Sequence, residues 1–220
     1  MTDQSPEYRD LRPEIAREIR QVAHFGSAGK VKELVAAAAT SIDDELYEEA
    51  LPGLLEAKTR APRSVHVREL LGLVYYQLGK WREAAREFAA YRRLSDKHDR
   101  DPEFADCERA LGRPEKAAEI LRSLPRDEVT EDVLCEALVV HAGALNDLGR
   151  HDEAVAVLES GPTSPKEVEP HHLRLWYALA DSLELADRRR DSRPWWDLIY
   201  AEDAEFFDVA RRRLGVRPRT

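Results

Sequence analysis

The pentapeptide GSAGK, residues 26–30, is the first stretch whose composition could bind a ligand, because glycine-rich turns that end in lysine cradle phosphate groups. Such a loop needs a wider spacing between its glycines, a preceding strand, and a serine or threonine after the lysine. Here Gly26 and Gly29 are close together, Val31 follows the lysine, and no strand pattern precedes them. We therefore interpret the stretch as a turn that breaks a helix.

Two adjacent histidines, His171 and His172, are the next candidates, because imidazole is the commonest metal ligand in proteins. Neighbouring residues on a helix project about 100° apart, so an adjacent pair is poorly placed to share one metal ion. Both follow Pro170 at an expected helix start, which favours a structural role. His141 is expected to face a neighbouring helix. The sequence thus predicts no metal site and no cofactor.

Other catalytic patterns do not stand out. We find no Ser/His/Asp order, no HExxH motif and no paired-carboxylate pocket. The two cysteines, Cys107 and Cys135, do not form a CxxC pair. We interpret them as reduced, partly buried thiols of a cytosolic protein, with a disulfide or a reactive thiol as the alternative. The expected protein is not an enzyme.

The composition is that of a helical protein that is not a general nucleic-acid binder. Of 220 residues, 43% are hydrophobic and 35% are charged, with a net charge of −9. No apolar run approaches the roughly 18 residues that span a bilayer, so we expect no membrane contact. Residues 1–10 are polar and do not resemble a secretory signal. A cytoplasmic location is therefore expected.

The elements that must position any functional side chain repeat along the sequence. Gly79, Ala84 and Phe88 mark one copy of the pattern within the segment Leu71–Tyr91. At 34 positions earlier, Ala50 and Leu54 take the places of Ala84 and Phe88. The pattern recurs 33 positions later as Gly112, Ala117 and Leu121, and after a further 37 positions as Gly149, Ala154 and Leu158. A last, degenerate copy has Asp187, Ser192 and Trp196 in the glycine, alanine and large positions. A near-constant period of this length is typical of stacked helix pairs.

This pattern resembles the tetratricopeptide repeat (TPR), a helix pair of about 34 residues with the signature W-x2-LG-x2-Y…A-x3-F…P. The matching residues of the best copy are Leu71, Gly72, Tyr75, Ala84 and Phe88. Arg68 replaces the tryptophan and Asp96 the final proline. The resemblance implies an all-α fold, a right-handed α-solenoid of about five TPR-like helix pairs with capping helices at both ends. A helical bundle with a coincidental period is the alternative.

In more detail, the stretches Phe104–Leu124 and His141–Glu159 resemble an uncharacterised TPR family of actinobacteria. That resemblance implies the same fold and no known activity. In a TPR-like pair we expect Gly72 to lie opposite Ala84, with both small so that the helices approach closely. Gly79 is expected to end its helix in a left-handed conformation.

The expected organisation has three parts: an N-terminal tail with a short cap helix over 1–30, the solenoid over 31–204, and a C-terminal capping helix with a basic tail over 205–220. The solenoid units are expected at 31–64, 65–97, 98–131, 135–168 and 173–204. In the N-terminal segment, one helical face carries Ile15, Ile19 and Val22. This helix is expected to serve either as a cap or as a dimer contact. The C-terminal capping helix is expected to have an apolar side at Phe206, Phe207, Val209, Ala210 and Leu214, and a solvent-facing side at Arg211, Arg212 and Arg213.

The resemblance further implies a concave groove lined by the first helix of each pair. The expected lining residues are His66, Glu69, Leu73, Tyr76 and Gln77; Asp106 and Arg109; Val139, Gly143, Asn146 and Asp147; and Arg174, Tyr177, Asp181 and Glu184. The Lys/Asn clamp with which some family members hold a peptide carboxylate is absent. Aromatic and acidic side chains instead favour a basic or amphipathic segment of another protein as partner. The alternative is that these acids only keep the surface soluble.

Two further functions remain open. The first is nucleic-acid or ribosome association through a basic patch near the C-terminus, formed by Arg188, Arg189, Arg190, Arg193, Arg211, Arg212 and Arg213. Asp191, Asp197 and Asp208 are interleaved with these arginines and weaken that hypothesis. The second is a self-assembling structural protein, such as a homodimer, that associates through its solenoid ends.

Overall fold

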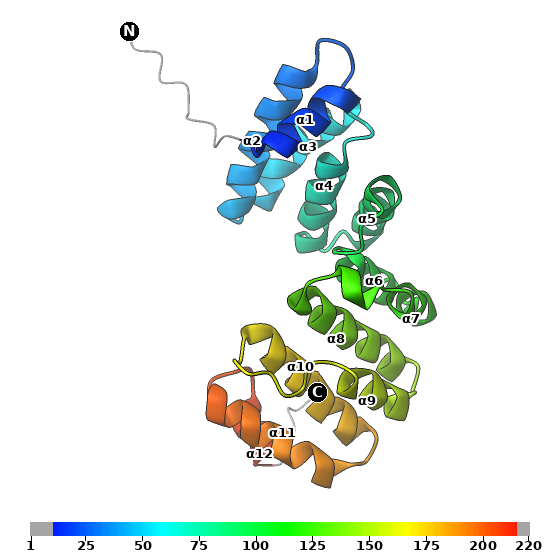
Figure 1. Ribbon diagram of the computed structural model, residues 1–220, viewed down its shortest axis with the longest axis vertical. Helices are drawn as coiled ribbons and strands as arrows, with labels where there is room; N and C mark the ends of the chain where they lie inside the picture. Colours follow the sequence, from blue (N-terminus) through cyan, green and yellow to red (C-terminus); the bar gives the residue numbers. More distant parts are fainter. Residues whose placement is uncertain (1–10, 215–220) are drawn as a thin grey trace. The chain divides into compact units, whose positions relative to one another are not determined.

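The computed structural model describes residues 11–214, and every regular element in that range is helical (Figure 1). The chain divides into two compact units between Lys97 and His98. The helices of unit 1 are α1 (Pro13–Val22), α2 (Ala28–Asp43), α3 (Tyr47–Arg60), α4 (Val65–Gln77) and α5 (Trp81–Ser95). Those of unit 2 are α6 (Asp101–Ala110), α7 (Pro114–Arg122), the 3-10 turn η1 (Arg126–Glu128), α8 (Glu131–Asp147), α9 (His151–Glu159), α10 (Pro170–Leu185), α11 (Arg189–Glu202) and α12 (Val209–Arg213).

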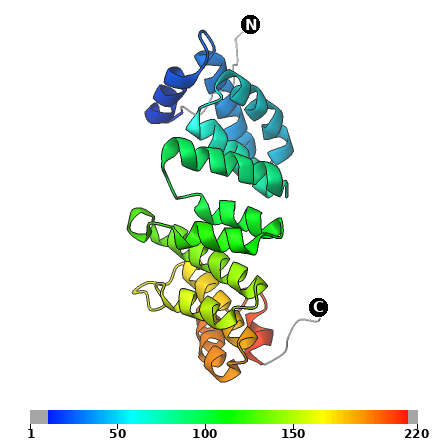
Figure 2. The ribbon, with the colours of Figure 1, turned by 90° about the vertical axis from the view of Figure 1, so that its right-hand side faces the viewer.

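Helix pairs are the building blocks of both units. In unit 1, α2 packs on α3 and α4 on α5, while α3 contacts α4 and α1 packs on α2. In unit 2 the pairs are α6 with α7, α8 with α9, and α10 with α11, and neighbouring pairs stack on one another (Figure 2). The first helices α6, α8 and α10 also contact each other in order. No helix within residues 11–214 has both the length and the apolar character needed to cross a membrane.

The turns inside the pairs share one left-handed backbone position. Gly79, Gly112 and Gly149 adopt φ values of +66°, +72° and +72° there. Glu45 and Asp187 occupy the equivalent place in the first and last pairs, both with φ of 60°. This conformation strains residues that carry a Cβ atom. The prediction that Asp187 takes the place of a turn glycine is thereby confirmed.

The close approach of α4 and α5 depends on Gly72, as a Cβ atom built at this position shows. A Cβ atom built on Gly72 would lie 2.6 Å from Cε1 of Phe88. The three nearest atoms to that position all belong to the Phe88 ring, so Phe88 packs directly against this glycine. The Phe88 ring is 1% exposed and fills the space beside Gly72, and the expected position of Gly72 opposite Ala84 stays a prediction.

Arg68, which replaces the expected tryptophan, takes part in a buried charge network. Its Nη1 donates a 2.7 Å hydrogen bond to Oε2 of Glu87, which is 5% exposed. Lys58, from the preceding pair, donates to the other oxygen of the same carboxylate. A buried carboxylate needs such partners because water is excluded from it. In unit 2, Glu108 is likewise buried and accepts hydrogen bonds from Arg113 and Lys116.

The two ends of the described chain differ from each other. At the N-terminal end, Ile19 is fully buried in the core of unit 1, with Ile15 and Val22 partly buried beside it. Ile19 thus belongs to the core of its own unit, which favours the cap over a dimer contact at this residue.

At the C-terminal end, α12 is a single short turn of helix, and two predictions about it were wrong. Phe207 and Leu214, expected on the apolar side, are 71% and 77% exposed. Arg212, expected on the solvent-facing side, is 8% exposed because carboxylates of α10 surround its guanidinium. The side chain of Ala210, like residues 1–10 and 215–220, lies outside the described part.

Candidate functional site

The α4 face of unit 1 carries the first set of expected groove residues. His66 Nδ1 lies 3.4 Å from Oε2 of Glu69, one turn further along α4. Leu73 and Tyr76 are half-buried and Gln77 is exposed. The Tyr76 ring packs edge-on against Trp81, with 5.3 Å between ring centroids. The α4 face therefore presents an acid, an aromatic ring and an aliphatic side chain.

A cavity of about 380 Å³ opens beside this face. Its lining includes His66 and Glu69 from α4, Ile15 and Glu18 from α1, and Tyr91 from α5. Glu18 is already engaged, because it accepts hydrogen bonds of 2.8 Å from Ser64 Oγ and 2.7 Å from the backbone N–H of Val65. Those bonds cap the start of α4 and fix α1 against it. The remaining lining groups are Arg12, Glu14, Val65, Ser95 and Lys97.

In unit 2, the expected groove residues of α6 and α8 are bound to one another. Arg109 Nε donates a 2.6 Å hydrogen bond to Asp147, and its Nη1 donates a 3.1 Å bond to Asp106. The guanidinium lies over Gly143, where an added Cβ would come within 3.2 Å of Cζ. Partial burial lowers the pKa of Arg109, but the hydrogen bonds and charges of the two aspartates outweigh it and raise that pKa. Arg109 is thus held charged between two helices.

The same kind of link joins α8 to α10. Asn146 Nδ2 donates a 2.9 Å hydrogen bond to Ser182 Oγ, and Arg174 pairs with Glu136. Val139 is half-buried on the same helix as Asn146. The structure therefore brings together the expected residues of α6, α8 and α10 within unit 2, through side-chain contacts between successive first helices.

Residues 203–214, here called the C-terminal segment, cover the expected groove positions of α10. The Tyr177 hydroxyl donates a 2.6 Å hydrogen bond to Asp208 Oδ1. The Tyr177 ring also meets Phe206 and Phe207 edge-on, at centroid distances of 6.3 and 5.4 Å. Burial and the Asp208 carboxylate raise the pKa of Tyr177 to about 12. At α10 the expected face is therefore occupied by the chain itself.

Arg212 is the centre of that contact. Its guanidinium pairs with Asp181 and, at 3.3 Å, with Glu184. It also lies 4.9 Å from the ring centroid of Trp196 and 6.0 Å from that of Tyr177, which are cation–π distances. Acidic and aromatic side chains of α10 and α11 thus bind an arginine.

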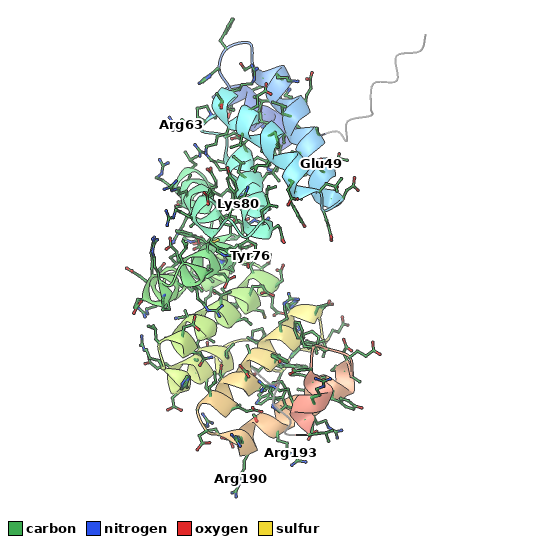
Figure 3. The ribbon with its side chains drawn as sticks, turned by 180° about the vertical axis from the view of Figure 1, so that it is seen from behind. Glu49, Arg63, Tyr76, Lys80, Arg190 and Arg193 are labelled. Atoms are coloured by element: carbon green, nitrogen blue, oxygen red, sulfur yellow. The ribbon has the colours of Figure 1, made fainter. Side chains whose placement is uncertain are left out.

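The arginines of the expected basic patch do not form one continuous set of unpaired cations. Arg188 pairs with Asp191, Arg213 pairs with Asp197, and Arg212 is buried. Arg190 and Arg193 extend outward from α11 (Figure 3). The exposed members are Arg188, Arg189, Arg190, Arg193, Arg211 and Arg213. Neutralisation by neighbouring acids lowers the attraction that this surface offers to a nucleic acid.

A cluster that the sequence did not predict lies where α8 meets the first turn of α10. Cys135, His171 and His172 each offer a ligand atom within 4.8 Å of the others. The two imidazole rings are 4.1 Å apart at their centroids, so the expectation that they point apart was wrong. Burial and the charges of Glu131 and Glu136 raise the pKa of Cys135 to about 12. Only the packing of two helices distant in sequence unites these residues, so no local motif signals them.

Only the start of the GSAGK stretch forms the predicted turn, because Ala28, Gly29 and Lys30 already belong to α2. Gly26 has a φ of +75°, and α2 begins two residues later at Ala28. Apart from its neighbours along the chain, no described residue lies within 4 Å of a Cβ atom placed on either Gly26 or Gly29.

The sequence matches none of the protein-family models and none of the curated proteins compared with it. Solved structures are similar to it. YrrB, described as a TPR protein with an unusual peptide-binding site, is 17% identical with a TM-score of 0.60 over 82% of this chain and 90% of that one. MamA is 13% identical with a TM-score of 0.63, covering 86% and 98%. A thermophilic TPR protein of Thermus thermophilus, TTC0263, is 15% identical with a TM-score of 0.59, covering 84% and 97%.

At these identities the likeness concerns the fold and not the ligands. The narrower resemblance to an actinobacterial family stays a prediction. Together with the all-helical pairs and their left-handed turns, the comparisons show that this chain has the tetratricopeptide-repeat fold, as the sequence predicted.

Proposed function

We propose that this chain is a non-catalytic scaffold whose first helices bind a basic or amphipathic segment of another protein. The observation that carries the proposal is the binding of Arg212 by Asp181, Glu184 and the Trp196 ring. These are the types of side chain that would recognise an arginine of a partner. The C-terminal segment is thus an intramolecular example of the ligand chemistry that we propose.

The α4 face of unit 1 offers the same types of group to an external ligand. Glu69 and Tyr76 supply an acid and an aromatic ring, and Glu14 adds a carboxylate to the adjoining cavity of about 380 Å³. A basic side chain placed there would meet the carboxylates of Glu69 and Glu14, of which Glu14 also lies 3.7 Å from Nε of Arg12. Its aliphatic stem would meet Ile15. The proposed binding site is therefore α4 with its cavity, and α10 binds external segments only when the C-terminal segment is displaced.

The peptide-binding site of YrrB is a property of that protein, and it supports the proposal as an example of peptide recognition on this fold. A nucleic-acid partner is the weaker alternative, because acids pair with Arg188, Arg212 and Arg213. A homodimer stays a prediction that the size of the protein in solution tests.

The test uses a synthetic peptide that reproduces residues 204–213, and a second peptide in which glutamates replace its arginines. Each is titrated against the full chain by fluorescence anisotropy. We expect the arginine peptide to bind, and the Glu69→Gln and Tyr76→Ala variants each to weaken it about 10-fold, as removal of one good contact residue does. Glu49→Gln, an exposed change on the second helix α3, is the control (Figure 3).

Three results would contradict the proposal: no binding of the arginine peptide, equal affinity for the two peptides, or equal weakening by the control. Loss of binding with Tyr177→Ala alone would move the site to α10. Circular dichroism of each variant must match the wild type, so that a loss of affinity reports a lost contact and not a lost fold.

A further inference from the structure

The cluster of Cys135, His171 and His172 has the donor types of a transition-metal site. Cys135 lies on α8, and the two histidines lie in the first turn of α10. Cys135 is fully buried and His172 is 1% exposed, while the side chain of His171 is 16% exposed. One thiol and two imidazoles whose ligand atoms lie within 4.8 Å of one another are a donor set that suits Zn²⁺.

His171 provides a second, independent sign of a ligand. Its Nε2 atom is buried and has no hydrogen-bond partner among the residues that the structure describes. The Glu131 carboxylate oxygen is 3.6 Å away, which is too far for a hydrogen bond. Buried polar atoms are nearly always paired, and one that is not requires an explanation. A metal ion at this nitrogen would supply one.

Glu131 can complete the coordination. It precedes Cys135 by one helical turn on α8, so both side chains project from the same face. Its Oε1 lies 3.0 Å from His172 Nε2, and its side chain is 57% exposed and free to adjust. One thiolate and one carboxylate balance the charge of a divalent cation when both imidazoles are neutral.

We propose that Cys135, His171, His172 and Glu131 together bind one Zn²⁺ ion, which joins α8 to the first turn of α10. Tetrahedral coordination at the usual bond lengths places ligand atoms roughly 3.5 Å apart, so the cluster must contract by about 1 Å. The exposed residues 166–169, which lead into α10, allow that movement. The ion would strengthen the stacking of two helix pairs within unit 2.

Binding also requires a change at His172. In the structure its Nδ1 accepts a 3.0 Å hydrogen bond from the backbone N–H of Glu169, which requires the tautomer that carries its proton on Nε2. A metal-bound histidine normally donates a hydrogen bond through its other nitrogen. Coordination through Nε2 therefore moves the proton to Nδ1 and breaks the bond to Glu169, which is part of the N-terminal cap of α10.

The test uses Co²⁺ as a spectroscopic probe on reduced, chelator-treated, full-length protein. We expect visible bands of tetrahedral Co²⁺ together with a thiolate-to-cobalt charge-transfer band, and the loss of both when Zn²⁺ is added. Cys135→Ser should abolish the charge-transfer band and weaken binding by more than the roughly 100-fold that loss of an outer-shell partner can cost. Cys107→Ser is the matched control, because Cys107 is equally buried but lies on α6.

His171→Gln is a second variant, at a side chain that is 16% exposed, and circular dichroism establishes that each variant is folded. The His171→Gln variant should weaken Co²⁺ binding as strongly as Cys135→Ser does. The proposal is overturned if wild type binds no Co²⁺, or if the spectrum lacks the thiolate band. It is also overturned if folded Cys135→Ser or folded His171→Gln keeps wild-type affinity, because the ion would then be held by surface carboxylates.

Discussion

The hydroxyl of Tyr177 donates its hydrogen bond to a carboxylate oxygen of Asp208, and this contact ties α10 to the residue before α12. Phe206 and Phe207 add aromatic contacts to the same ring. Since Tyr177 was predicted to face a ligand, the contact shows where the chain covers its own expected binding face. The strength of this attachment decides whether α10 is accessible to another protein.

The variant Tyr177→Phe tests that attachment, because it removes the hydrogen bond and keeps the ring. A hydrogen bond to a charged group contributes about 1.5–3 kcal/mol, and part of that is lost when water replaces it. We expect amide hydrogen exchange in residues 209–213 to become about 10-fold faster. Amides of α8 serve as the internal reference, and equal rates in the two proteins would show that the C-terminal segment is held by other contacts.

Gly72→Ala should destabilise the protein, although alanine favours a helix by about 1 kcal/mol over glycine. The added Cβ would lie 2.6 Å from the ring of Phe88, which is 1% exposed, so the ring or the helix must shift. Overpacking of this kind costs about 1–3 kcal/mol. We therefore expect the free energy of unfolding, measured with urea, to fall by about 1 kcal/mol.

Gly29→Ala provides the contrast for that measurement. Gly29 lies in α2 with nothing within 4 Å of its added Cβ, so this variant should be as stable as wild type or slightly more so. If Gly72→Ala were the more stable of the two, the close approach of Phe88 to Gly72 would be refuted.

Asp187→Gly and Glu45→Gly should each stabilise the protein by about 0.5–1 kcal/mol, because both residues adopt the left-handed backbone conformation in a turn between paired helices. Glycine carries no steric penalty in that conformation. Gly149→Ala, at the equivalent turn, should destabilise by a similar amount. Thermal unfolding of the three variants measures the effect, and an unchanged midpoint for all three would refute the argument from strain.

His141 should make stability depend on pH. Burial, followed by the charges of Arg122, Arg126 and Arg150, lowers its pKa, so the folded protein binds the proton less readily than the unfolded chain. The stabilisation is complete above the unfolded pKa of about 6.5 and is lost as the pH falls through the folded value. In urea unfolding between about pH 7 and 5, His141→Gln should show a shallower decline than wild type. If the free energy of unfolding fell in parallel with pH for wild type and His141→Gln, groups other than His141 would cause the decline.

The helix pairs were predictable because the pattern that encodes them is local. Gly79, Ala84 and Phe88 recur at a near-constant interval, and each copy sets its own turn and its own buried face. Even the degenerate copy was aligned correctly, since Asp187 occupies the left-handed turn. The same pattern requires a small residue at position 72, and the structure places the Phe88 ring against it.

The contacts between distant segments were not predictable, because they depend on how the pairs pack and not on any local pattern. Arg212 looks like a surface residue in the sequence, and its burial follows from Asp181 and Glu184, which lie on one face of the much earlier helix α10. Cys135 and His171 come together through the stacking of α8 and α10 across an intervening helix and loop. Neither of these two contacts corresponds to a residue spacing that can be recognised in the sequence.

The charge network at Glu87 also limits how freely the repeats of this chain could be exchanged. Its carboxylate is buried between Arg68 of its own pair and Lys58 of the pair before it. A copy of the second pair moved elsewhere, or one restored to the consensus tryptophan at residue 68, would contain a buried acid with an incomplete set of partners. The side-chain contacts between the first two repeats therefore fix the order of these repeats, and this solenoid is not an array of interchangeable modules.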